Sequence, residues 1–126
     1  MKLDRKIYVY FLENYQDEDG NTLTRKNYII PQGGYLKASY RALSASEVVK
    51  MKEQKEDCTC QFEINPRSSI NTDCFVEFSR PLFGLRTYSI TGIDTYDEKK
   101  RTRWRLRARE VTPEQPDEIR WGVVHG

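Results

Sequence analysis

The sequence has little histidine, little cysteine and no long hydrophobic run, and each scarcity excludes a class of protein. Its one histidine stands at position 125, and it contains neither a Gly-x-Ser-x-Gly elbow nor a phosphate-cradling glycine loop. Because no nucleophile-plus-base constellation can be named, we expect a protein that is not an enzyme and uses no cofactor. The longest apolar run, IYVYFL at 7–12, is far too short to span a bilayer. We therefore expect a soluble protein, made in the cytoplasm, with no membrane partner.

The three cysteines are an odd number with no signal peptide ahead of them, which argues against a secreted disulfide framework. A structural zinc needs four ligands, usually with about two to four residues between paired cysteines, whereas Cys58 and Cys60 are separated by one residue and Cys74 stands alone. Buried cysteines that serve as small apolar residues explain the pattern better than a metal site. The stretch DEDGN at 17–21 resembles the start of a calcium loop, but Tyr28 stands where its glutamate is expected, so we interpret it as an Asp-Gly turn.

The charge of the chain is segregated. At 126 residues we expect one domain, and the formal net charge is only +2. Residues 99–109 nevertheless hold seven of the 21 basic residues and no acidic one, which leaves 14 basic residues against 19 acidic ones elsewhere. A dedicated nucleic-acid binder is more often basic throughout, whereas a positive segment on a negative remainder suits copies that meet through unlike faces.

Alternation of apolar and polar residues predicts a mainly β fold. Turn signals separate the alternating stretches, and their short spacing favours a small antiparallel β-barrel or sandwich of about six strands. In one of these stretches Leu36, Ala38, Tyr40 and Ala42 fall on the same face. The stretches expected to be extended are 4–12, 24–30, 35–43, 58–64, 74–79, 85–94 and 99–110.

One short helix is expected at about 45–54, within a helix-bearing loop at about 44–57. Ser44 and Glu47 have capping-box spacing, which marks the start of the helix. Its apolar stripe is narrow, so the helix can cover a sheet edge or face but cannot be a core helix.

The chain is expected to divide into a β-barrel domain at 1–111 and a C-terminal tail at 112–126. The tail has two prolines, mixed charge and a late apolar patch. It is poorly equipped to pack on itself, so it is either flexible or docks on another surface. The apolar patch consists of Ile119, Trp121, Val123 and Val124.

An arginine occupies every second position of the last expected strand, which places all of them on one face. This arginine row consists of Arg101, Arg103, Arg105, Arg107 and Arg109. Matching apolar to apolar residues across the final hairpin sets a register, unless Gly92 marks a bulge. In that register the row faces no carboxylate on the neighbouring strand. The expected pairs are Trp104 with Gly92, Leu106 with Ile90, and Ala108 with Tyr88.

The arginine row has two interpretations. A solvated strand face would suit an ordinary alternation of lysine and threonine. The exclusive use of arginine favours bidentate contacts with protein carboxylates or nucleic-acid phosphates. We therefore interpret the arginine row as a charged assembly interface. Replacing Arg105 and Arg107 together by glutamate should then abolish assembly.

The order of these features resembles the head–tail joining proteins of long-tailed bacteriophages, specifically the head-closure or stopper family. The resemblance lies in a loop with DEDG, a strand ending in YRALSASE, a short helix, CQFEINPR, and VEFSRPLFGLRTYSITGIDTYDEKKRTRWRLRAREV. It covers roughly residues 1–111, and the C-terminal half contributes most of it.

The resemblance implies a β-barrel subunit of a ring in the virion neck, assembled in the host cytoplasm and without catalytic residues. Such a homo-oligomeric ring helps to retain packaged double-stranded DNA, contacts a portal or adaptor protein, and receives a tail terminator or tail tube protein. The helix-bearing loop then faces the channel through Glu47, Lys50 and Lys52, and the apolar patch of the tail is a docking surface.

Two alternatives remain open. One is a small β-barrel that binds single-stranded nucleic acid with the arginines and with Trp104, Tyr88 and Tyr96 as stacking partners. The predicted register argues against Trp104 and Tyr88, because it turns both inward. The other is a tail-completion or tail-terminator protein of the same particle.

Overall fold

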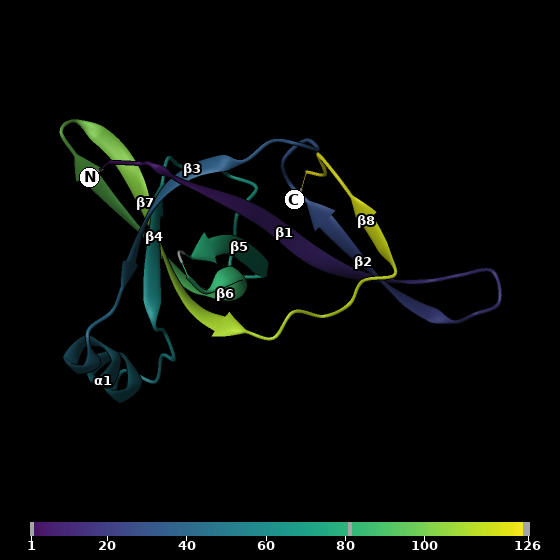
Figure 1. Cartoon of the computed structure of the whole chain (residues 1–126), viewed down its shortest axis with the longest axis horizontal. Coiled ribbons are helices and arrows are strands. Elements are labelled where there is room, and N and C mark those ends of the chain that lie inside the picture. The colour runs from purple at the N-terminus through teal and green to yellow at the C-terminus, as the bar shows by residue number, and fades with distance from the viewer. Residues whose placement is uncertain (1, 81, 125–126) are drawn as a thin grey trace.

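A computed structural model of the chain describes residues 2–80 and 82–124, and within them it has eight strands and one helix (Figure 1). The mainly β fold with one short helix is thus confirmed. The elements are β1 (Arg5–Gln16), β2 (Thr22–Tyr28), β3 (Leu36–Ala42), α1 (Ala45–Glu53), β4 (Cys60–Ile64), β5 (Cys74–Arg80), β6 (Gly84–Glu98), β7 (Arg101–Val111) and β8 (Glu118–Arg120).

Six of the strands close into a ring. The sheet order is β3-β4-β7-β6-β5-β1-β2-β8, and an additional pairing of β3 with β1 completes the circle. All pairs of the ring are antiparallel. A closed sheet leaves no edge strand within the ring, which agrees with the predicted small β-barrel.

Strand β1 is long enough to take part in both the ring and an extension. Its first residues pair with β3, its middle pairs with β5, and the segment from Tyr10 to Gln16 pairs with β2. The β1–β2 hairpin therefore projects from the barrel, on the right of Figure 1. Its tip is the predicted Asp-Gly turn, in which the Asp17 carboxylate accepts hydrogen bonds from the Asp19 and Asn21 amides and Gly20 has a φ of 82°.

The barrel interior is filled by aromatic and branched side chains from every strand of the ring. Phe62 and Phe78 meet edge to face with their ring centroids 5.5 Å apart, and Tyr88 packs against Phe62 at 5.3 Å. Each of these side chains is at most 3% exposed, and burying a side chain of this size contributes about 2 kcal/mol to stability. The three cysteines are free and buried, as predicted, and burial raises the pKa of Cys60 to about 12.

The predicted inward face of β3 is only partly correct. Ala38 is fully buried, but Ala42 is exposed and the neighbouring Ser39 is buried. Ala42 is the last residue of the strand, two positions before the helix cap, so it lies where the chain leaves the sheet.

The predicted register of the β6–β7 hairpin is wrong. Ala108 pairs with Ile90 and Leu106 with Ile93, because a β-bulge lies between Ile90 and Gly92. The extra residue moves the rest of β6 along β7, so Ile93 packs against the core. The inward direction of β7 is nevertheless confirmed, because Leu106 and Ala108 are fully buried and Trp104 packs against the core.

The segment after residue 111, predicted to be either flexible or docked on another surface, docks on the chain itself. Strand β8 pairs in parallel with β2, and the Asp117 carboxylate accepts a hydrogen bond of 2.7 Å from the Thr24 amide. Residues 125–126 of the predicted tail lie outside the described part of the chain. The sole helix of the described residues is too short to cross a membrane.

Candidate functional site

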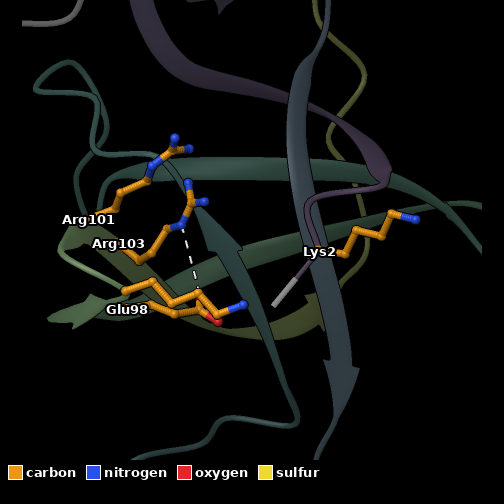
Figure 2. Close-up of a pocket in the computed structure, with 5 residues that line it drawn as sticks. Lys2, Glu98, Arg101 and Arg103 are labelled. Atoms are coloured by element: carbon orange, nitrogen blue, oxygen red, sulfur yellow. Dashed lines mark ion pairs between the residues drawn. The ribbon is translucent and has the colours of Figure 1, made fainter.

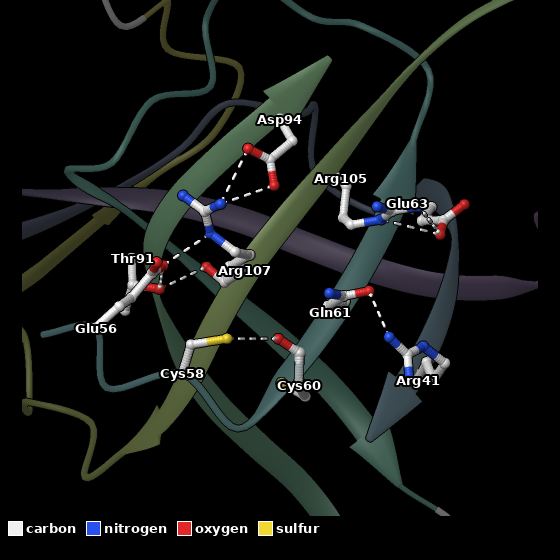
Figure 3. Close-up of polar contacts among 10 residues, drawn as sticks. All are labelled: Arg41, Glu56, Cys58, Cys60, Gln61, Glu63, Thr91, Asp94, Arg105 and Arg107. Carbon is white, nitrogen blue, oxygen red and sulfur yellow. Dashed lines mark hydrogen bonds and ion pairs between the residues drawn. The ribbon is translucent and has the colours of Figure 1, made fainter. Parts of the chain in front are cut away.

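The middle of the arginine row is neutralised by carboxylates of the same chain (Figure 3). Arg107 Nε lies 2.8 Å from Oε1 of Glu56, which follows α1, and Arg107 Nη1 lies 2.8 Å from Oδ2 of Asp94 on β6. The Thr91 hydroxyl donates to the same Glu56 oxygen at 2.9 Å. The side chains of Arg107 and Glu56 are only 24% and 19% exposed, so losing one would leave the other poorly solvated.

Gly92 explains how the Arg107 guanidinium reaches this position. A β-carbon at Gly92 would lie 2.0 Å from Arg107 Nη2 and 2.7 Å from its Cζ. The missing side chain therefore leaves the space that the guanidinium fills. The sequence predicted that Trp104 would cover this glycine, whereas Trp104 pairs with Thr95 instead.

Arg105 is held between β4 and β6. Its Nε lies 3.4 Å from Glu63 Oε1, and its guanidinium lies over the Tyr96 ring at 4.6 Å from the centroid. The Tyr96 hydroxyl also donates to Glu63, which is only 5% exposed. Burial, followed by this hydrogen bond, raises the pKa of Tyr96. Arg105 is thus engaged through both its charge and its face.

The remaining two paired arginines differ in burial. Arg109 Nη1 lies 3.4 Å from Asp57 Oδ2, and both side chains are largely exposed, so this pair contributes little. Arg103 is only 13% exposed, donates a hydrogen bond to Asn65, and has its Nε 4.0 Å from Glu98 Oε2. The prediction that the row meets no carboxylate on its neighbouring strand is therefore wrong, because Asp94 and Glu98 both belong to β6.

The tip of the same hairpin is different. Strand β4 accompanies β7 only from Ala108 to Trp104, and beyond this point the β6–β7 hairpin continues without it. Two lysines at positions 99 and 100 form the turn. Within the described residues, Lys99, Lys100 and Arg101 form no ion pair.

Of these tip residues, Lys99 and Arg101 border an open hollow of about 650 Å³ (Figure 2). In the figure, Arg101 and Arg103 extend side by side from one wall, and Lys2 stands on the opposite side. Four of the five described lining residues are cations, namely Lys2, Lys99, Arg101 and Arg103, and the fifth is Glu98.

The predicted channel residues all lie on α1, which projects from the barrel at the end of β3 (Figure 1). Lys50 and Lys52 are exposed, whereas Glu47 closes the predicted capping box with Ser44. Hydrogen bonds from Arg41, followed by the Ser44 amide, lower the pKa of Glu47 to about 2. Glu47 thus stabilises the helix, which buries none of its own residues and agrees with the prediction that it is not a core helix.

The predicted apolar patch of the tail is partly used within the chain. Trp121 stacks on Tyr28 with ring centroids 4.2 Å apart and an interplanar angle of 9°. Ile119 and Val124 remain 50% and 83% exposed. The patch therefore lies beside β2 and keeps an exposed outer surface.

Two features were not found from the sequence. The first is an exposed apolar turn, comprising Leu82, Phe83 and Leu85, whose residues are 102%, 56% and 60% exposed. The stretch RPLFG at 80–84 separates two of the expected strands, and its Leu82 and Phe83, together with the following Leu85, were the available signal. We call it the apolar turn.

The second feature is a buried ion pair on the outer side of the barrel wall. Lys26 Nζ lies 3.4 Å from Glu77 Oε2, and the Tyr28 hydroxyl donates to the other Glu77 oxygen. Burial, followed by the Glu77 hydrogen bond, raises the pKa of Tyr28. Because β2 and β5 are far apart in sequence, no local pattern could bring these residues together. The cluster is closed over by Trp121 stacked on Tyr28.

The stacking partners required for single-stranded nucleic acid are not open to a base. Tyr88 is 2% exposed in the core, Trp104 packs against it, and Arg105 covers the Tyr96 ring. Within residues 2–80 and 82–124, no group of three or more His, Cys, Asp or Glu side chains is placed to hold a metal ion.

Comparison with known proteins identifies a similar fold. No family model matches the chain, and a search of curated proteins finds no match. The solution structure of protein SF1141 from Shigella flexneri 2a is similar, with a TM-score of 0.66 and 23% sequence identity. The match covers 90% of this chain and 96% of SF1141. At this level of identity the match concerns the fold alone, and it extends over nearly the whole of both chains.

Proposed function

We propose that the protein is a structural subunit of a ring in the neck of a long-tailed bacteriophage virion. In this role it closes the head beneath a portal or adaptor protein after DNA packaging and offers a docking surface to a tail terminator or tail tube protein. The resemblance in the order of sequence motifs motivates the proposal. A six-stranded ring with a helix-bearing loop between β3 and β4 is compatible with it.

The observation that carries the proposal is the apolar turn. Leu82 is fully exposed and Phe83 and Leu85 are more than half exposed, although a small soluble domain gains stability by burying such residues. Arg80 lies over the Phe83 ring at 4.8 Å from its centroid, so the turn presents an ordered apolar surface flanked by a cation. An interface with a neighbouring subunit would bury this surface.

A ring requires a second surface on each subunit that accepts the first. A hollow of about 300 Å³ is lined by Leu85 of the apolar turn and by the charged Arg86 and Glu110, so it belongs to the same surface as the turn. The second exposed apolar surface is the patch of the tail, with Ile119, Trp121 and Val124. The chain therefore has more apolar contact surfaces than a monomer needs, which favours an assembly role over an isolated one.

The contacts of the arginine row determine which substitutions can test assembly. Reversing Arg105 and Arg107 would break internal ion pairs with Glu63, Glu56 and Asp94, so loss of assembly could follow from misfolding. Replacing Leu82 and Phe83 by serine changes only exposed side chains. Val49→Ser on α1 is a matched control, since Val49 is 55% exposed and lies outside the apolar turn.

The test is light scattering combined with electron microscopy of the purified chain. We expect rings from the wild type and from Val49→Ser, and folded monomers from the Leu82→Ser, Phe83→Ser variant. A wild type that stays monomeric, both alone and when mixed with portal and tail-tube proteins, would contradict the proposal. Rings that cap isolated tail tubes and do not bind heads would favour the tail-terminator alternative.

A further inference from the structure

We propose that the tip of the β6–β7 hairpin binds the phosphate backbone of double-stranded DNA. The binding residues are Lys99, Lys100 and Arg101, with Lys2 and Arg103 at the border of the hollow. The inference rests on the proposed function in one respect, the choice of duplex DNA as the polyanion. The positive charge of the tip does not depend on the formation of a ring.

The first support is the division of charge within one strand. Arg105, Arg107 and Arg109 each lie within 3.4 Å of a carboxylate from their own chain. At the tip, Lys99, Lys100 and Arg101 form no ion pair with any described residue. The positive charge that is free to meet a ligand is therefore concentrated in the turn and not spread along the arginine row.

The second support is the backbone of the turn itself. Lys99 and Lys100 have φ values of 48° and 65°, in the left-handed region that side chains other than glycine, asparagine and aspartate disfavour. Two-residue hairpin turns of this kind usually contain Asn-Gly. A strained turn that presents two adjacent ammonium groups at its apex indicates a role in contact with a ligand and not in stability.

The third support is the composition of the hollow. All five of its described lining residues are charged, four of them positively and Glu98 negatively, and none is apolar. Protein–protein interfaces usually have an apolar or aromatic centre, whereas nucleic-acid interfaces are polar and strongly positive. This makes a nucleic-acid backbone a better match than an acidic protein surface.

The tip is also accessible. The β6–β7 hairpin extends from the barrel on the left of Figure 1, on the opposite side from the β1–β2 hairpin. Arg103 is anchored by Asn65 and Glu98, so it supports the wall of the hollow, while the exposed Arg101 can contact a phosphate from outside. The hollow binds phosphate groups of the DNA backbone and does not bind a base.

The test measures binding of a fluorescent 30-base-pair duplex by anisotropy across a salt series. The variant Lys99→Gln, Lys100→Gln, Arg101→Gln removes three charges at the tip. The control variant Lys37→Gln, Lys55→Gln, Arg86→Gln removes three charges from exposed positions elsewhere. Neutralising three phosphates gives a slope of about −3 in log affinity against log salt.

We expect the tip variant to lose at least tenfold in affinity at low salt and most of that slope, and the control to retain both. Equal loss in the two variants, or no binding by the wild type at low salt, would overturn the inference. Polyglutamate that competes as well as duplex DNA at equal charge would assign the tip to acidic proteins instead. Rings without DNA binding would refute only this inference, and DNA binding without rings would refute only the proposed neck role.

Discussion

The two halves of the arginine row, Arg105 to Arg109 and Arg101 to Arg103, have the same sequence pattern and different surroundings. Toward its C-terminal end, β7 runs beside β4 and the segment after α1, which supply Glu63, Glu56 and Asp57. Toward the tip, β6 is the one described strand that pairs with it. Alternation of arginine therefore identifies one face of a strand, but the neighbouring elements decide whether that face is part of the fold or is open to a ligand.

The difference has a thermodynamic side. A shielded arginine between two carboxylates contributes to stability because removing it leaves buried negative charge without a partner. An exposed arginine at the tip contributes almost nothing to stability, and its charge remains available for binding. Substitutions that are chemically identical should thus act on different properties of the protein in the two halves.

The largest effect is expected for Arg107→Glu compared with Arg101→Glu. The first places a third carboxylate beside Glu56 and Asp94 and should lower the free energy of unfolding by about 3 kcal/mol or more. The second should change it by less than about 0.5 kcal/mol. Urea denaturation of both variants measures the difference. Equal losses would mean that the two halves are not distinct.

An intermediate effect is expected for Gly92→Ala. The new methyl group would displace the Arg107 guanidinium and weaken its charge-assisted hydrogen bonds, with a loss of about 2 kcal/mol. In an Arg107→Ala background the same change should cost nothing, since the space is then empty. Additive effects in this double-mutant cycle would show that Gly92 serves another purpose.

The smallest effect, and the only stabilising one, is expected at the turn. Replacing Lys99 by Asn and Lys100 by Gly relieves two left-handed lysines and should raise the free energy of unfolding by about 1 kcal/mol. The same variant should bind duplex DNA more weakly, because two of the tip charges are lost. Thermal denaturation and anisotropy measure the two outcomes, and a variant that improves both would contradict our interpretation of the turn.

Local features of the fold could be predicted from the sequence. The capping box at Ser44 and Glu47, the Asp-Gly turn and the strand alternation depend on residues a few positions apart, so their physics is visible in a short window. The burial of the cysteines followed from the same alternation.

Features that depend on distant segments could not be predicted. The bulge before Gly92 changed the register of the last hairpin, and Glu56 and Glu63 reach the arginine row only because β4 pairs with β7. The row was identified as the main charged feature, but its neutralised half could not be separated from its open tip without the fold. The three-residue strand β8 is too short for any periodicity to reveal.

Strand β8 also determines how the sheet ends. Without it, β2 would present a seven-residue edge with free amide and carbonyl groups, which is a template for adding a strand from another molecule. The pairing with β8 covers Arg25, Lys26 and Asn27 of that edge, and the short strand that covers them includes Glu118 and Arg120. The C-terminal segment thus shields part of the β2 backbone from the addition of a strand from another molecule.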